Sequence, residues 1–142
     1  MSVYADTSFL FSLYVPDVNA SAALATMRRL KPRLLTTDFG EFEFINSLNL
    51  SIFRGQMQTP DVQRVLALFT ADVRAGLIVV APMTFPIYDR AKQLASAQTR
   101  ILGTRSLDIL HVASALSLKS TTFLTFDLRQ RKLALAAKLR VR

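Results

Sequence analysis

Two aspartates directly follow short apolar segments that are typical of β-strands. Asp6 follows residues 3–5, and Asp127 follows residues 122–126. Ligands of open parallel sheets bind beyond the carboxyl ends of the strands, so aspartates after two neighbouring strands would face one crevice. Two such carboxylates repel each other unless a cation lies between them or they take up protons. The alternative is that each aspartate only caps the helix that follows it.

A third acid, Asp108, stands in an apolar helix predicted over residues 106–118, with Ser106 as its N-cap. An acid in the first turn ordinarily stabilises the helix dipole. The neighbours of Asp108 leave little exposed surface, however, and an ionised carboxylate in such surroundings usually has a cation or a donor as partner. His111 falls on roughly the same helix face. As a lone histidine it is expected to pack or to form hydrogen bonds rather than to bind a metal.

A fourth acid, Glu43, lies between Phe42 and Phe44 in a long predicted helix. A carboxylate is costly in this environment unless another group pairs with it. Glu41 would point to nearly the opposite side of the helix, and we expect it to be the solvated acid of the two. Asn46, one turn after Glu43, could donate a hydrogen bond to Glu43 or hold a substrate, or it could be a polar residue at the rim of the crevice.

The composition narrows the chemistry further. The 142 residues include no Cys and one His, which excludes disulfides, zinc–cysteine sites, thiol catalysis and His-rich metal sites. A hydrophobic content of 51% is enough for one folded domain, expected over residues 1–142. The net charge of +8 points to a polyanionic partner, most simply nucleic acid. We expect no signal peptide, no membrane helix and a reducing, cytoplasmic location.

These acids must be positioned by alternating strands and helices. Short strands are predicted at residues 3–5, 34–36, 77–80, 122–126 and 139–141, with seven helices between them. Asp38 is expected to cap the long helix, and another helix is expected over residues 86–100. The apolar segment 77–80 suits a strand buried on both faces. The pattern predicts a three-layer α/β/α sandwich around a parallel five-stranded sheet.

Four segments, YADTSFL, FEFINSL, RSLDILHVASAL and FLTFDLRQRKLA, occur in this order along the chain. Together they resemble the PIN-domain ribonucleases, especially the VapC-type toxins of bacterial toxin–antitoxin pairs. The resemblance runs from residue 3 to Val141. The spacing of Glu43 and Asn46 agrees with the family pattern, although Glu41 is a rival for the acid. A departure is Lys138-Leu139, where relatives often carry a Gly before the last strand.

The resemblance implies an α/β/α sandwich and a metal-dependent endoribonuclease. The implied metal ligands and catalytic residues are Asp6, Glu43, Asp108 and Asp127, which would hold one or two Mg²⁺ or Mn²⁺ ions. Oxygen ligands without Cys or several His favour these ions over zinc or copper. The implied accessory residues are Thr7, Ser8, Asn46, His111 and Thr125. Capping by Thr7 or Ser8 and the β-propensity of Thr125 are alternative explanations for these hydroxyls.

The resemblance also implies partners, namely RNA, a cognate antitoxin that covers the site, and a second copy in a homodimer. Two basic groups are candidates for RNA binding, or could be solvated helix ends; they are Arg28, Arg29, Lys31 and Arg33, and Arg129, Arg131 and Lys132. The antitoxin groove could be lined by apolar residues that could equally belong to the core, namely Phe9, Phe11, Leu13, Tyr14, Phe53 and Met57.

Other functions fit the sequence less well. An aspartyl-nucleophile phosphatase would need a second Asp two residues after Asp6, where Ser8 stands. A phospho-receiver domain would need paired acids after the first strand and a Lys after a late strand, and the chain has neither. A PIN-like housekeeping nuclease and a non-catalytic nucleic-acid-binding module remain as alternatives. A pure binder would have no need of four buried carboxylates or of Mg²⁺ or Mn²⁺.

Overall fold

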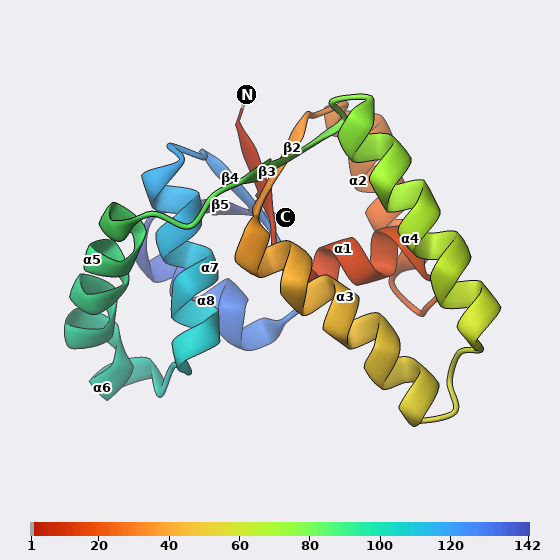
Figure 1. The fold of residues 1–142 in the computed structure, drawn as a ribbon. Coiled ribbons are helices and arrows are strands. Elements are labelled where there is room, and N and C mark those ends of the chain that lie inside the picture. The colour runs from red at the N-terminus through yellow and green to blue at the C-terminus, as the bar shows by residue number, and fades with distance from the viewer. Residues whose placement is uncertain (1) are drawn as a thin grey trace.

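The computed structural model describes residues 2–142, in which a parallel sheet has helices on both faces (Figure 1). The strands are β1 (Val3–Ala5), β2 (Leu34–Thr37), β3 (Ile78–Ala81), β4 (Thr122–Leu124) and β5 (Arg140–Val141). They are ordered β3-β2-β1-β4-β5, and every neighbouring pair is parallel. The predicted fold class and all five predicted strands are therefore confirmed.

The helices fall into two groups that lie on opposite sides of the sheet in Figure 1. One group contains α1 (Thr7–Tyr14), α2 (Ala20–Leu30), α3 (Asp38–Phe53) and α4 (Thr59–Arg74). The other contains α5 (Phe85–Leu94), α6 (Arg100–Leu102), α7 (Ser106–Ser117) and α8 (Leu128–Ala136). A π-helical segment, Ala95–Thr99, joins α5 to α6, so the helix predicted over residues 86–100 consists of three consecutive segments.

Side-chain alternation along β1 produces a core on each face of the sheet. Val3 and Ala5 pack into one core with α1, α3 and α4, whereas Tyr4 points into the other core with α7 and α8. Because successive strand residues point to opposite faces, an apolar strand of this kind must be covered on both sides. Burial of β1 at the centre of the sheet therefore fixes the position of Asp6, its next residue.

The structure corrects the expectation that the third strand is buried on both faces. β3 lies at the edge of the sheet, and of its four residues only Ile78 is buried. Leu77, which precedes it, is exposed. The apolar β-branched sequence correctly indicated a strand but could not indicate its place in the sheet.

Two helix caps also differ from the prediction. Thr37, not Asp38, is the N-cap of α3, because its hydroxyl oxygen accepts a hydrogen bond from the Gly40 amide at 3.1 Å. Arg105, not Ser106, occupies the N-cap position of α7 and makes no side-chain capping bond. Each correction moves the cap by one residue and leaves the helix itself in place.

Lys138 stands before the last strand, at the place where the family pattern often has a glycine. Its φ of 65° lies in the left-handed region, which glycine adopts without steric cost. Lys138 adopts this conformation at the turn from α8 into β5, so the chain makes the turn without a glycine.

Candidate active site

Asp6 is the most buried of the candidate acids, with 1% of its surface exposed. It is the N-cap of α1, and its Oδ1 accepts hydrogen bonds from the Phe9 amide at 3.0 Å and the Ser8 hydroxyl at 2.7 Å. Its Oδ2 accepts one from the Thr125 hydroxyl at 2.5 Å. Burial raises the pKa of Asp6, although His111 and these donors act against the shift. A nearby cation would therefore stabilise the ionised carboxylate.

Ser8 and Thr125 join the ends of β1 and β4. The Ser8 hydroxyl accepts from the Phe126 amide at 2.9 Å, and the Thr125 hydroxyl accepts from the Asp127 amide at 3.0 Å. The two strands are neighbours, with Ala5 opposite Leu124. The strands before Asp6 and Asp127 are therefore neighbours, as a shared crevice requires. Asp127 does not directly follow its strand, however, because β4 ends at Leu124 and two residues separate them.

Asp127 is the N-cap of α8. Its Oδ1 accepts hydrogen bonds from the backbone amides of Arg129 at 2.7 Å and Gln130 at 3.2 Å. Asp127 therefore caps a helix, as Asp6 does, and also lines the same cavity as Asp6. The two interpretations of these aspartates, helix capping and a shared crevice, are therefore both correct.

Glu43 on α3 is held by a hydrogen-bonded chain that ends in the core. Its Oε1 accepts a bond from the Thr7 hydroxyl at 2.7 Å and contacts Nε2 of His111. Nδ1 of His111 lies 3.0 Å from the Tyr4 hydroxyl, and the histidine is 2% exposed. Partial burial alone would raise the pKa of Glu43, but the hydrogen bond and charge of His111, with Thr7 and Arg105, lower it overall.

These contacts settle the expectations for the neighbours of Glu43. His111 is a hydrogen-bonding residue, as predicted. Asn46 is exposed and does not line the cavity, and within residues 2–142 no hydrogen bond joins it to Glu43. Of the alternatives for Asn46, the bond to Glu43 is therefore not observed, and contact with a substrate stays a prediction. Ser47, four residues after Glu43 on α3, lines the cavity.

Asp108 in the first turn of α7 is buried and has a cationic partner that the sequence analysis missed. Nε of Arg105 lies 3.2 Å from Oδ2 of Asp108, and most of the arginine side chain is exposed. The expectation that an acid in this apolar helix has a partner is correct. The spacing of three residues between a base and an acid could have identified the pair.

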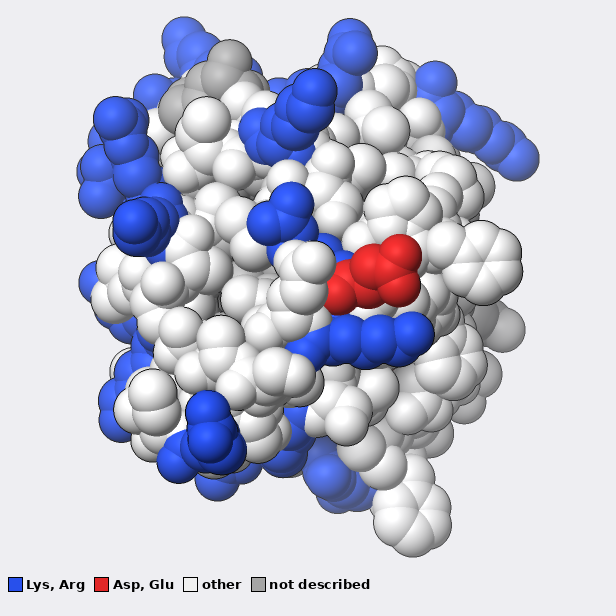
Figure 2. Space-filling view, turned by 90° about the vertical axis from the view of Figure 1, so that its left-hand side faces the viewer, with Lys and Arg blue, Asp and Glu red and all other residues white. Residues whose placement is uncertain are grey.

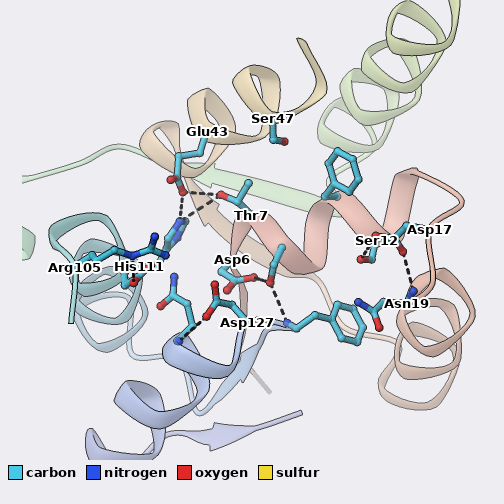
Figure 3. A pocket seen from close by; sticks show the side chains of 15 residues that line it. Asp6, Thr7, Ser12, Asp17, Asn19, Glu43, Ser47, Arg105, His111 and Asp127 are labelled. Atoms are coloured by element: carbon cyan, nitrogen blue, oxygen red, sulfur yellow. Dashed lines mark hydrogen bonds and ion pairs between the residues drawn. The ribbon is translucent and has the colours of Figure 1, made fainter. Parts of the chain in front are cut away.

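All four predicted acids line one cavity of about 440 Å³ at the carboxyl edge of the sheet. In Figure 3, Arg105 and His111 lie at one end of this cavity, Asp17 and Asn19 at the other, and Asp6 between them. Thr7 and Ser8 also line it, while Thr125 reaches it through Asp6. Phe11, which was considered for the partner groove, lines the cavity as well. The lining residues that the sequence analysis missed are Ser12, Asp17, Asn19, Ser47, Arg105, Phe126 and Gln130.

Comparison with known proteins identifies the family. Residues 3–135 match the family model of the PIN domain. The chain belongs to the PIN domain family. None of the curated proteins matches this chain in sequence.

Solved structures share the PIN fold at low sequence identity. VapC20 of Mycobacterium tuberculosis, a sarcin–ricin loop cleaving toxin, is 17% identical with a TM-score of 0.70, over 98% of this chain and 99% of that chain. FitAcB of Neisseria gonorrhoeae is 15% identical with a TM-score of 0.69, over 98% and 95%. VapBC2 of Rickettsia felis, solved with a fragment of its promoter DNA, is 12% identical with a TM-score of 0.70, over 100% and 98%.

The donor chemistry of this PIN domain fits a hard divalent cation. The four acids offer only carboxylate oxygens, the ligands that Mg²⁺ and Mn²⁺ prefer. Asp6 is buried, and its hydrogen-bond donors are two hydroxyls and an amide, none of them charged. Residues 2–142 contain no group of three His, Cys, Asp or Glu side chains placed to hold a metal. The carboxylates therefore share a cavity without forming a closed ligand set.

The two predicted basic groups of the PIN domain lie at opposite edges of the sheet. The first group is exposed between the end of α2 and the start of β2, which is the amino edge. The second is exposed on α8, whose N-cap Asp127 lines the cavity. Figure 2 shows Lys and Arg side chains scattered over the face on the α5–α6 side, with one small acidic patch. Only the α8 group is therefore adjacent to the cavity.

Most of the apolar residues considered for a partner groove belong to the core of the PIN domain. Phe9 is buried, and the side chains of Phe11, Leu13, Tyr14 and Met57 pack against the same core. Phe53, the remaining residue of that set, is 87% exposed at the end of α3. None of the helices in the described part of the chain has the length and apolar character needed to cross a bilayer.

Proposed function

We propose that this single-domain protein is a metal-dependent endoribonuclease, the toxin of a VapBC-type toxin–antitoxin pair. The observation that carries this proposal is that Asp6, Glu43, Asp108 and Asp127 line one cavity in a chain of the PIN family. These acids come from four separate segments of the sequence, and each is held by its own hydrogen bonds or ion pair.

The structural neighbours support the toxin assignment. VapC20 cleaves the sarcin–ricin loop, and the FitAB and VapBC2 pairs were solved on DNA fragments. By this likeness we expect an antitoxin that covers the cavity, a homodimer and a cytoplasmic location. Phe53, one of several exposed apolar residues, could contact such a partner.

Asp6, Glu43, Asp108 and Asp127 would hold the cation. When bound, Mg²⁺ or Mn²⁺ would lower the pKa of a water molecule and offset the charge of the phosphate. Asp108 and Glu43 are the candidates to accept the proton of the attacking water. Thr7 and His111 orient Glu43, while Ser8 and Thr125 orient Asp6. Attack by water would leave a 5′-phosphate and a 3′-hydroxyl on the products.

The α8 bases Arg129, Arg131 and Lys132 are the better candidates for the RNA backbone, because α8 begins at the cavity. The basic residues of the first group, Arg28, Arg29, Lys31 and Arg33, would contact only RNA that extends to the opposite edge of the sheet. Electrostatic contacts of this kind weaken as salt concentration rises, because each releases counterions.

The test is cleavage of RNA by the purified protein with Mg²⁺ or Mn²⁺. Asp6→Asn is the informative variant, because asparagine also caps helices well and the fold of α1 should be retained. We expect the variant, or the wild type in EDTA, to lose cleavage, whereas Asp89→Asn, at an exposed position on α5, should cleave normally. Full activity of Asp6→Asn, or of wild type in EDTA, would exclude the proposed chemistry.

Expression in bacterial cells separates the toxin from a housekeeping nuclease. Growth arrest by the wild type and not by Asp6→Asn supports a toxin, and sequencing of the cleaved ends identifies the RNA. Normal growth with cleavage in vitro indicates a housekeeping nuclease. RNA binding that needs no divalent metal and is followed by no cleavage indicates a binding module.

A further inference from the structure

Gln130 is a buried amide that the proposed chemistry leaves without a role. It lies in the first turn of α8, lines the cavity beside Asp127, and is 4% exposed. Its backbone amide donates to Oδ1 of Asp127 at 3.2 Å. Its side-chain Oε1 is buried and has no hydrogen-bond partner within residues 2–142.

An unpartnered buried amide is unfavourable for folding. Burial of a polar group without a hydrogen bond costs free energy, and nearly all buried polar groups in folded proteins are paired. An apolar side chain of similar size would fill the same space without that cost. Because Gln130 lines the cavity, a ligand bound there is the candidate for the missing partner.

We propose that the Gln130 amide binds the 2′-hydroxyl of a ribose next to the scissile phosphate. This inference rests on the proposed ribonuclease function. The unpaired Oε1 is an acceptor, so its partner must be a donor, and the phosphodiester group has none to offer. A 2′-hydroxyl both donates and accepts, as the two ends of an amide require.

The position of Gln130 favours the sugar over the base. Asp127 is one of the carboxylates placed around the phosphate site, and its Oδ1 is bonded to the Gln130 backbone. The sugar is joined directly to the phosphate, whereas the base lies beyond the sugar. Because the 2′-hydroxyl distinguishes RNA from DNA, Gln130 would restrict the substrate to a strand with ribose at this nucleotide.

The experiment compares an RNA oligonucleotide with the same oligonucleotide carrying a single 2′-deoxy nucleotide on either side of the cleavage site. Wild type should cleave the all-ribose strand on the order of tenfold faster than one of the deoxy strands, the effect of one buried hydrogen bond. Gln130→Met should reduce this preference to about onefold while cleaving the deoxy strand at the wild-type rate. Gln93→Met, on the exposed surface of α5, is the matched control and should keep the preference.

Two readouts keep the inference separate from the proposed function. Gln130→Met should melt at the wild-type temperature or above, because the substitution removes an unpaired buried amide. If the methionine variant does not fold, Gln130→Leu is used instead. In an Asp6→Asn background, affinity for the all-ribose and deoxy strands in Mg²⁺ measures recognition without cleavage. If the ratio of the two affinities, all-ribose strand to deoxy strand, is the same with and without Gln130→Met, the inference is overturned, whether or not the protein is a nuclease.

A role in the cation site would give a different result. Gln130→Met would then slow cleavage of both strands equally and raise the Mn²⁺ concentration needed for half-maximal activity. That outcome also overturns the assignment to the sugar.

Discussion

Replacement of Thr125 by valine tests the support of the buried Asp6 carboxylate. Valine keeps the shape and the β-propensity of threonine but lacks the hydroxyl that donates to Asp6 at 2.5 Å and accepts from the Asp127 amide at 3.0 Å. The change leaves one carboxylate oxygen and one backbone amide without this partner.

The size of the effect follows from the burial of these groups. A buried polar group that loses its hydrogen-bond partner costs about 1–3 kcal/mol of stability, and Asp6 and Thr125 are both buried. We therefore expect Thr125→Val to lower the free energy of unfolding at neutral pH by about 2 kcal/mol. For a domain of this size the corresponding fall in melting temperature is about 6 °C.

Urea denaturation of the metal-free protein at neutral pH measures this difference. Thr70→Val, at an exposed position on α4, is the matched control and should change stability by less than about 0.5 kcal/mol. Thr125→Ser should recover most of the loss because it restores the hydroxyl. If Thr125→Val unfolds with the same free energy as Thr70→Val, the hydroxyl does not support the Asp6 carboxyl group and the reasoning fails.

Three further results are expected. A Cβ at Gly40 would lie 2.3 Å from the hydroxyl oxygen of buried Thr36, so Gly40→Ala should lower the free energy of unfolding by about 1–3 kcal/mol in urea denaturation. Burial raises the pKa of Asp6 in the folded protein above its value in the unfolded chain, so the metal-free protein should lose stability as pH rises between these two pKa values. Asp6→Asn should make the free energy of unfolding less dependent on pH in this range. An unchanged pH dependence would contradict the assignment of the effect to Asp6. Arg129→Gln should weaken RNA binding and reduce its salt dependence by about one counterion, whereas Arg29→Gln should have little effect; equal losses would mean that RNA reaches both edges of the sheet.

The sequence predicted the fold because its local signals agree with one another. Short apolar segments alternate with helical periodicity, and this combination allows few arrangements other than a parallel sheet covered on both faces. The edge position of β3 was not predictable in the same way, because Ile78-Val79-Val80 would serve equally well in a central strand. Strand order depends on the packing of the whole chain, and local sequence carries little of that information.

The sequence predicted those site residues that stand out from the residues on either side of them. Asp6 and Asp127 follow strands, and Asp108 is conspicuous in an apolar helix. The bond between Tyr4 and His111 joins residues 107 positions apart, so no local pattern could indicate it. Gln130 was missed for a related reason, because its unpaired oxygen is visible only once the surrounding atoms are placed.

The two interpretations of Asp6 and Asp127 that the sequence left open describe one arrangement. Each aspartate uses Oδ1 to cap the helix after its strand, and this bond fixes the carboxylate at the carboxyl edge of the sheet. The positive ends of the α1 and α8 dipoles also offset part of the charge that the aspartates bring together. Capping therefore lowers the cost of holding acidic groups in one cavity, and a parallel sheet provides such a helix start after each of these strands.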